Sequence, residues 1–306
     1  MQINRPGSDI EMNKPKYFIT DVFTNKKYGG NPLATFVDCE SLSEKEMQQI
    51  AKEINFSETT FITSRVQNDN GYDVRIFTPN AEVAFAGHPT LGTAYILREK
   101  LRLTADNEVV LNLRVGKIKV TFSAPSETVL KLWMKQMPSK FGKQIEPDKL
   151  ARVLNLGLSG FVTAHPIEEV STGFPTLVVP LTSLAALKRV KINKDEYFAL
   201  VKDAWAKVIL IYSLESYEQG QNLSVRVFAD FYGIAEDAAT GSSNGSLAAY
   251  LVRHNPLGDS LVSVTVGQGY EMGRPSTLVL RAQQKNGEID VSIGGSVVEV
   301  AEGVWG

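Results

Sequence analysis

The sequence predicts an α+β fold of two half-chain repeats, in which curled antiparallel sheets wrap around one buried helix in each domain. Predicted strands outnumber predicted helices and few β-α-β units occur, which favours α+β over a parallel α/β arrangement. A strand, turn and helix frame also occurs twice along the chain. Together these observations indicate two similar domains.

The repeated frame is visible in two pairs of segments. Val-Arg-Ile-Phe at 74–77 matches Val-Arg-Val-Phe at 225–228, and Ala-Gly-His at 86–88 matches Thr-Gly-Ser at 240–242. The members of each pair lie roughly 150 residues apart, about the length of one ordinary domain. The repeat therefore predicts that the two halves place equivalent helix starts after equivalent strands.

The expected domains follow from this repeat. We expect an N-terminal domain of residues 15–142 and a C-terminal domain of residues 143–306, whose last strand returns to the first domain. Residues 142–147 are expected to link the two. Residues 1–14 are polar and without a usable period, which predicts a flexible leader.

Composition excludes several classes of function. The chain has 306 residues, 43% hydrophobic and 22% charged, with a net charge of −2, so no long-range positive field attracts nucleic acid or anionic lipid. A single cysteine, Cys39, excludes an internal disulfide framework and a cysteine-based metal cluster. No apolar run approaches the length of a membrane span and no secretory signal opens the chain, so we expect a cytoplasmic protein.

The first half opens with strands and two helices. Ser43 and Glu46 form a capping box that predicts a helix through residue 54, which then turns sharply at 55–62 into a strand. A buried helix is predicted at 89–100, after a loop. Pro89 stands near its first turn, where a missing N–H costs nothing. The other strands are predicted from period-two alternation and β-branched residues, at 17–23, 33–37, 71–77, 108–113, 117–122 and 129–134.

The second half follows the same pattern. Helices are predicted from Asp148, at 194–201 and from about Ser243. Strands are predicted near Phe161 and Thr176, and at 207–212, 223–228, 261–266, 276–282, 288–293 and 297–301.

The stretch 233–251 is the one around which the chain is organised. A small-residue turn with two carboxylates, Glu236 and Asp237, precedes an Ala/Leu-rich helix that must begin inside the protein. The first N–H groups of a helix have no intrahelical acceptor and carry partial positive charge. The small side chains that follow Thr240 therefore predict a cradle for an anion, in which Gly241 and Ser242 donate N–H groups to a carboxylate.

Three side chains are candidates for proton transfer. Glu58 lies at a corner between a helix and a strand; if it points inward, burial raises its pKa and suits it to act as a general acid or base, and otherwise it is a solvated turn residue. His88 stands at a helix start, where the dipole favours neutral imidazole that relays a proton or holds a substrate, or simply caps the helix. Asp237 either assists proton transfer, binds a substrate amine or caps the turn.

A glycine-rich loop at 267–276 carries Arg274, which either clamps a substrate carboxylate or braces the loop itself. No P-loop is present, because the run at 241–245 has no following lysine, and no dinucleotide fingerprint follows a predicted strand.

The motifs together resemble those of the phenazine-biosynthesis isomerase family, the PhzF-like proteins. The resemblance covers about residue 17 to the end, and it rests on six segments in the family's order, at 21–34, 55–61, 75–79, 85–94, 236–242 and 268–276. Ala238 stands where the family commonly has proline, and Ser243 with Asn244 where Ala-x is frequent. Neither departure removes a group that performs chemistry.

The resemblance implies a diaminopimelate epimerase-like fold of two pseudo-symmetric domains, each an antiparallel sheet around a central helix, with the active site in the cleft between them. It also implies a homodimer that needs no cofactor and no metal. The family's acid/base glutamate falls on Glu58, and supporting residues fall on His88 and Asp237. Predicted substrate-binding positions lie at the two helix starts: Gly87, Pro89, Thr240, Gly241 and Ser242.

Three functions remain open at this point. The first is a cofactor-independent isomerase that shifts a proton within a small carboxylate. The second is a two-base racemase or epimerase of the same fold; this is disfavoured because such enzymes place a thiol on each side of the substrate, whereas His88 and Ser242 stand at the helix starts and Cys39 lies in another loop. The third is a carboxylate-binding protein without activity.

Overall fold

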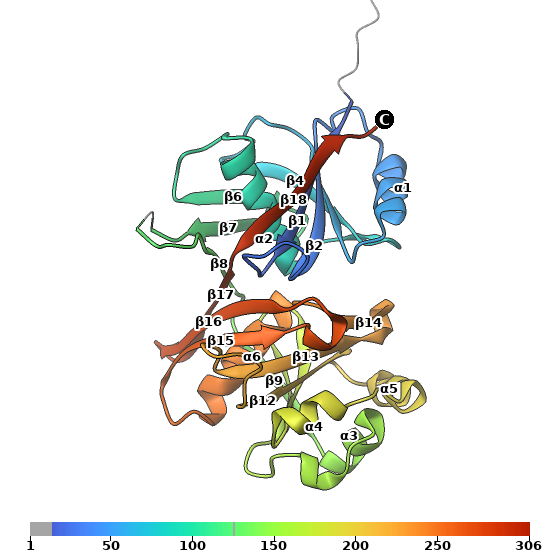
Figure 1. Ribbon diagram of the computed structural model, residues 1–306, viewed down its shortest axis with the longest axis vertical. Coiled ribbons are helices and arrows are strands. Elements are labelled where there is room, and N and C mark those ends of the chain that lie inside the picture. Colours follow the sequence, from blue (N-terminus) through green and yellow to red (C-terminus); the bar gives the residue numbers. More distant parts are fainter. Residues whose placement is uncertain (1–13, 125) are drawn as a thin grey trace, which may run out of the picture.

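The computed structural model describes residues 14–124 and 126–306, and they form a mixed, sheet-dominated fold with 18 strands in one connected sheet. Figure 1 shows the first half of the chain above the second, with β17 and β18 running from the lower part to the upper. Within the described residues no helix is long and apolar enough to cross a membrane.

The first half agrees closely with the elements predicted for it. The capping box exists, since the Glu46 amide donates to Ser43 Oγ at 3.3 Å and the Ser43 amide donates to Glu46 Oε2 at 2.8 Å. The elements are β1 (Lys16–Val22), β2 (Asn31–Val37), α1 (Glu44–Ile54), β3 (Thr59–Ile62), β4 (Tyr72–Phe77), β5 (Glu82–Val83), α2 (Gly87–Tyr95) with a π-helical turn (Ile96–Lys100), β6 (Glu108–Leu113), β7 (Gly116–Phe122) and β8 (Leu132–Lys135).

The second half contains the predicted helices and the four last strands. Its elements are β9 (Lys140–Ile145), α3 (Pro147–Leu154), β10 (Ile167–Ser171), β11 (Pro175–Pro180), α4 (Leu184–Arg189), α5 (Lys194–Val201), β12 (Val208–Ser213), β13 (Leu223–Ala229), β14 (Ile234–Asp237), α6 (Gly241–His254), β15 (Leu261–Gln268), β16 (Ser276–Lys285), β17 (Glu288–Gly295) and β18 (Val297–Val304), with short 3₁₀ turns at Leu158–Gly160, Asp230–Tyr232 and Tyr270–Met272.

Strand pairing follows the same order in both halves. In the first, β1–β2, β3–β4, β4–β5, β6–β7 and β7–β8 pair antiparallel, while β2–β3 and β4–β6 pair parallel. In the second, the corresponding pairs β10–β11, β12–β13, β13–β14, β15–β16 and β16–β17 are antiparallel, and β11–β12 and β13–β15 are parallel. The expectation of purely antiparallel sheets is therefore wrong, because a helix crosses over between the strands of each parallel pair.

The expected linker at 142–147 is also wrong. Residues 140–145 form β9, which pairs with β10, and α3 begins at Pro147. A Cβ atom at Gly142 would lie 2.9 Å from Glu169 Oε2 and 2.9 Å from the Trp205 ring, so the glycine allows this close packing. At the other end of the chain β18 pairs with β1, and β8 pairs with β17.

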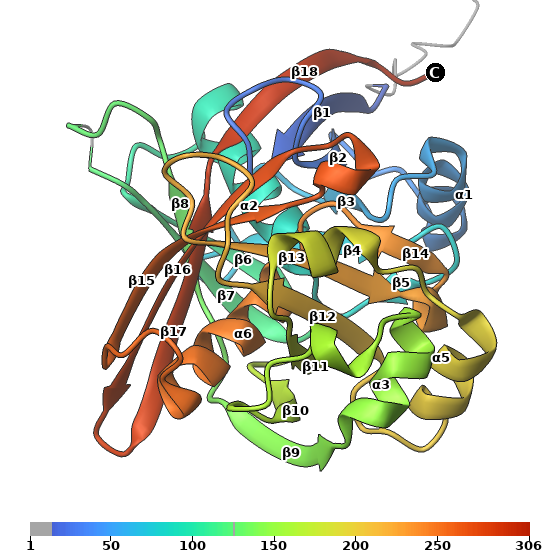
Figure 2. The same cartoon turned by 60° about the horizontal axis from the view of Figure 1, so that its bottom comes forward.

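Two buried helices, α2 and α6, lie among the strands. Residues 87–94 of α2 are buried, and the helix contacts β1, β2, β3, β6, β7, β8 and β18. Helix α6 is buried from Ser243 to Leu251 and contacts β10, β11, β12, β15, β16 and β17. Small and apolar residues all around both helices explain this burial, because neither has a polar face to present to water. Figure 2 shows α6 close to β15 and β17.

Several segments differ from their predictions. Helix α6 begins at Gly241 rather than Ser243, and residues 234–237 form β14 rather than a turn, because they pair with β13 despite lacking an alternating pattern. Phe161 forms only an isolated bridge to Leu181. The strand predicted at 129–134 begins at Leu132 instead. Besides β9 and β14, the sequence patterns did not predict β5, β10 and α4, and residues 1–13 of the expected leader lie outside the described residues.

Candidate active site

A cavity of about 570 Å³ lies between residues contributed by both halves of the chain. The first half supplies the corner between α1 and β3, the turn at 78–80 and the start of α2. The second half supplies parts of β12, β13 and β14 and the start of α6. This volume falls within the usual range of small-molecule sites.

The starts of α2 and α6 meet in this cavity. A Cβ atom at Gly87 would lie 3.5 Å from the Ser242 nitrogen and 3.7 Å from Gly241 Cα, which is van der Waals contact, so the two helix ends lie next to each other. Neither N-cap residue, Ala86 nor Thr240, makes a side-chain capping bond in the described part of the chain. The N-cap side chains therefore leave the first N–H groups of both helices uncapped, and N–H groups of this kind favour a negative charge.

Glu58 is placed by the sharp turn that follows α1. Asn55 ends that helix in the left-handed conformation with φ of 56°, and β3 begins at Thr59, so Glu58 is the last residue before the strand. Its side chain is 16% exposed and lines the cavity. Burial, and secondarily the charge of Asp237, raises the pKa of Glu58 to about 8.

His88 is the second residue of α2 and faces Glu58. Its Nε2 lies 3.6 Å from Glu58 Oε2, and neither atom has a hydrogen-bond partner among the described residues. Burial lowers the pKa of His88 to about 3, against the effect of a hydrogen bond to the Pro32 backbone. The imidazole is thus neutral at ordinary pH, as the sequence suggested, although burial rather than the helix dipole is the main cause.

Asp237 has a different environment from Glu58. Asn31 Nδ2 donates to its Oδ1 at 2.8 Å, and the Thr240 hydroxyl donates to its Oδ2. Burial raises the pKa of Asp237 to about 6, while hydrogen bonds from Thr240, Asn31 and the Ala238 backbone oppose that rise. At neutral pH Glu58 is therefore mainly protonated and Asp237 is mainly ionised.

The remaining predicted residues differ in whether they reach the cavity and in whether their N–H groups are free to bind a ligand there. Gly87, Gly241 and Ser242 line the cavity. Thr240 lines it as well, but its amide donates to Gln268 and its hydroxyl to Asp237, so both groups are already engaged. Pro89 is buried, is not among the cavity residues and has no N–H to donate.

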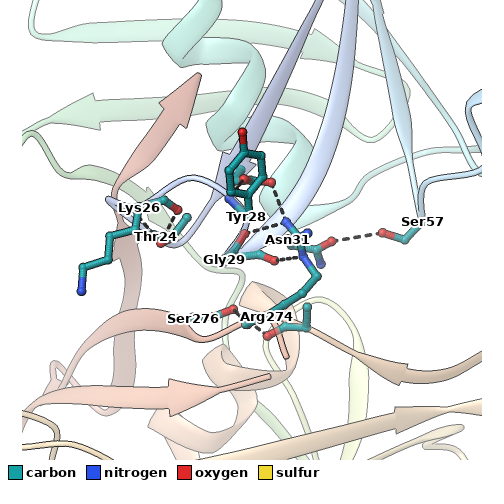
Figure 3. A network of polar contacts seen from close by, with 11 residues as sticks. Thr24, Lys26, Tyr28, Gly29, Asn31, Ser57, Arg274 and Ser276 are labelled. Atoms are coloured by element: carbon teal, nitrogen blue, oxygen red, sulfur yellow. Dashed lines mark hydrogen bonds and ion pairs between the residues drawn. The ribbon is translucent and has the colours of Figure 1, made fainter. Parts of the chain in front are cut away.

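Arg274 braces the loop at 24–31 instead of facing the cavity. Its guanidinium donates to the carbonyls of Gly30 at 2.8 Å and Gly29 at 2.6 Å, and to Asp21 Oδ1 at 2.5 Å. Figure 3 shows these contacts together with the bond from Ser57 to Asn31. Of the two roles considered for Arg274, the structural one is therefore observed.

Sequence reasoning missed Asn31, Ser57 and Gln268 as parts of the site. Gln268 is fully buried; its Nε2 donates to the Asp237 carbonyl at 2.8 Å and its Oε1 accepts from Asn244 Nδ2 at 2.9 Å. A polar residue at the border of a glycine-rich run was the available signal, since Asn31 follows Gly-Gly and Gln268 lies between two glycines.

Comparisons with known proteins bear on the family of this chain. The family model described as phenazine biosynthesis-like protein matches residues 20–303. The trans-2,3-dihydro-3-hydroxyanthranilate isomerase of Pseudomonas aeruginosa is 34% identical over 294 residues, covering 94% of this chain and 98% of its own. The crystal structure of a PhzF-family phenazine biosynthesis protein from Bacillus anthracis matches with a TM-score of 0.87 and 27% identity, covering 95% of this chain and 98% of that one.

A probable proline racemase from Agrobacterium radiobacter K84 shares the fold alone, with a TM-score of 0.58, 11% identity, and coverage of 95% of this chain and 93% of the racemase. Fold and relatives together define an isomerase. The chain belongs to the phenazine biosynthesis-like family, and the family predicted from its motifs is thereby confirmed.

Proposed function

We propose that this isomerase moves a proton within a small carboxylate substrate without a cofactor, with Glu58 as the acid/base. The observation that carries this proposal is the position of the Glu58 carboxyl in the same cavity as the starts of α2 and α6. Substrate would bind through its carboxylate at the N–H groups of Gly87, His88, Gly241 and Ser242, with one carbon beside Glu58.

The cavity favours a substrate with a single anionic group. No Lys or Arg is among the cavity residues in the described ranges, so the helix starts are the positive groups available there. The wall also carries aromatic groups, Phe56 and Phe85 from the first half and Phe174 and Tyr232 from the second, beside uncharged polar side chains such as Asn55 and Asn80. A monocarboxylate with an unsaturated body fits this lining, whereas a second carboxylate or a phosphate would be desolvated there without a cationic side chain to pair with.

The proton shift needs one group that both accepts and returns a proton. The Glu58 carboxylate takes a proton from a C–H next to an unsaturated or carboxylate-bearing carbon, and the electron pair moves into the conjugated system. The positive ends of the two helices stabilise the charge that develops. Protonated Glu58 then donates to another carbon, which gives an isomer of the same formula. A pKa near 8 suits both halves of this exchange.

We also propose a domain division and an oligomeric state for the chain. The recurring order of strand pairs and the two buried helices support two pseudo-symmetric domains, with residues 15–142 and 143–306 as their first approximation. Because β9 pairs with β10 and β18 with β1, we place β9 with the second domain and β18 with the first. We also propose a cytoplasmic homodimer that binds no nucleic acid; light scattering after size exclusion tests the dimer.

Deuterium exchange tests the proposed function. The protein is incubated in D₂O with trans-2,3-dihydro-3-hydroxyanthranilate, the compound named for the Pseudomonas relative, and NMR follows carbon-bound deuterium. We expect exchange in the wild type and a loss of about 10²–10⁴-fold in Glu58→Gln with the fold retained. Saturable binding of that compound without exchange would instead indicate a binding protein, and equal exchange in both proteins would remove Glu58 from the mechanism.

A further inference from the structure

Asn31 connects the two acidic groups of the site without lining the cavity itself. It is 2% exposed at the start of β2. Its Nδ2 donates to Asp237 Oδ1 at 2.8 Å and to the Ala239 carbonyl at 3.0 Å, and its Oδ1 accepts from Ser57 Oγ at 3.3 Å. One side chain from the first half therefore contacts both Asp237 and the residue adjacent to Glu58.

The loop that carries Asn31 is fixed from the second half of the chain. Arg274 binds the carbonyls of Gly29 and Gly30, and the Gly30 amide donates to the Pro275 carbonyl at 3.1 Å (Figure 3). Gly30 has φ of 62°, and a Cβ atom there would lie 2.3 Å from the Val22 carbonyl oxygen. The amide of Asn31 is thus presented in a defined orientation rather than on a free loop.

The two ends of this amide act on the two acids in opposite ways. Its N–H end is a donor, which favours the ionised form of Asp237. Its carbonyl end accepts the Ser57 hydroxyl, which has a single proton. A hydroxyl that donates to Asn31 cannot donate the same proton to Glu58, and a hydrogen bond from Ser57 would favour ionised Glu58.

We propose that Asn31 is a positioning residue that sets the protonation of the two acids apart, by holding Asp237 as a carboxylate and by keeping the Ser57 proton away from Glu58. The proposal rests on the proposed function, because it explains how Glu58 stays basic enough to take a proton from carbon. Ionised Asp237 adds to the effect, since its charge disfavours a second charge on Glu58.

The other titratable groups near the cavity do not account for the different protonation of Glu58 and Asp237. The cavity residues that titrate are Glu58, His88, Asp237 and Tyr232 in the described ranges. His88 is neutral over the relevant pH, because its pKa is lowered to about 3. Glu236 lies beside Asp237 and raises the pKa of Asp237, but it is bound by Arg226 at 2.9 Å.

The test measures carboxyl titration in the free protein. Glutamate and aspartate are labelled with ¹³C at the carboxyl carbon, and the Glu58 and Asp237 signals are assigned by their loss in Glu58→Gln and Asp237→Asn. In Asn31→Ala we expect the Asp237 midpoint to rise and the Glu58 midpoint to fall, each by about 1 pH unit, the value of one charge-assisted hydrogen bond. The pH at which exchange activity reaches half its plateau should fall with the Glu58 midpoint.

Further variants make the result decisive. Ser57→Ala removes the hydroxyl, whose proton Asn31 already accepts, and should leave both midpoints unchanged, whereas in Asn31→Ala/Ser57→Ala the Glu58 midpoint should fall less than in Asn31→Ala. Asn112→Ala is the matched control, because Asn112 Nδ2 donates to Asp73 Oδ1 at 2.8 Å outside the cavity, and it should move neither signal. If Asn31→Ala does not fold, the Ser57→Ala titration decides alone.

Unchanged midpoints, or midpoints that move in the same direction in Asn31→Ala, would overturn the role of Asn31. A Glu58 midpoint that rises in Ser57→Ala would do the same, because it would mean that the Ser57 proton already reaches Glu58. Because these titrations need no substrate, they remain informative if the wild type shows no deuterium exchange. That outcome would contradict the proposed function and leave the assignment of Asn31 standing.

Discussion

The strand and hairpin before each buried helix are built alike in the two halves of the molecule, yet the acids near them differ. In the first half Arg75 on β4 binds Glu82 on β5 at 2.8 Å and lies 5.1 Å from the Phe77 ring centre. In the second, Arg226 on β13 binds Glu236 on β14 at 2.9 Å and lies 4.9 Å from the Phe228 ring centre. The repeated sequence thus preserves individual contacts as well as the backbone.

The acids show where the halves diverge. Glu58 has an oxygen without a hydrogen-bond partner among the described residues, whereas both oxygens of Asp237 accept hydrogen bonds, from Asn31 and Thr240. The same burial therefore gives a carboxyl that keeps its proton in one case and a carboxylate in the other. A duplicated scaffold can hold two acids with separate tasks because their hydrogen bonds differ and because the charge of Asp237 raises the pKa of Glu58.

The largest expected effect separates the two acids. Glu58→Gln should reduce exchange by about 10²–10⁴-fold, because it removes the group that moves the proton. Asp237→Asn keeps that group and should cost roughly tenfold less, through poorer alignment of the α6 start. Deuterium exchange rates of both variants under saturating substrate measure this. Equal losses would mean that Asp237 also carries the proton, and the contrast between the acids would fail.

The two arginines should differ in their effect on stability. Arg226 is 8% exposed and also donates to the carbonyls of Leu187 and Val190 at 3.0 Å, whereas Arg75 is 28% exposed. Arg226→Met should destabilise by about 3 kcal/mol, since it leaves Glu236 poorly solvated and unpaired. Arg75→Met should cost about 1 kcal/mol. Urea unfolding of both variants measures the difference, and equal midpoints would contradict it.

The pH dependence of the reaction should report Glu58. A base with a pKa of about 8 is ionised in roughly one molecule in ten at pH 7, so kcat/KM should rise about tenfold per pH unit below 8 and level off above it. Asp237, ionised above about pH 6, should limit the rate only below that value. A profile that is flat from pH 6 to 9 would show that Glu58 does not titrate in this range.

The smallest effect concerns thermal stability. A carboxyl with a raised pKa in the folded state destabilises the protein as pH rises, between about 4.5 and 8 for Glu58 and between 3.8 and about 6 for Asp237. Glu58→Gln removes that cost, so its Tm should exceed that of the wild type by at least ~2 °C at pH 8 and by less at pH 5. Calorimetry at both values checks the sign; a gain that is largest at pH 5 would contradict it.

Much of the architecture was predictable from local patterns. The capping box at Ser43 and the alternation in the last four strands identified their elements because the information is carried by nearby residues. The strand β14 and the strand β9 were not predicted, since Ile-Ala-Glu-Asp has no alternation and the β9 segment is polar with a central glycine. Both are strands because of partners distant in sequence.

The acid/base residues of the site could be predicted from the sequence, but the residues that hydrogen-bond to them could not. Glu58, His88 and Asp237 were identified from motif positions, and the structure brings them around one cavity. The hydrogen bonds of Asn31 to Asp237 and of Gln268 to Thr240 join residues separated by 206 and 28 positions. Such pairings follow from the fold as a whole, which is why neither residue was recognised beforehand.

A crystal structure with benzoate bound at pH 6 tests the central claim most directly. The account predicts the carboxylate oxygens about 2.7–3.1 Å from backbone N–H groups of residues 87–88 and 241–242, with Glu58 about 3–3.5 Å from the ring. Benzoate bound elsewhere, or a Glu58 carboxyl turned to bulk water with the helix starts unoccupied, would contradict it.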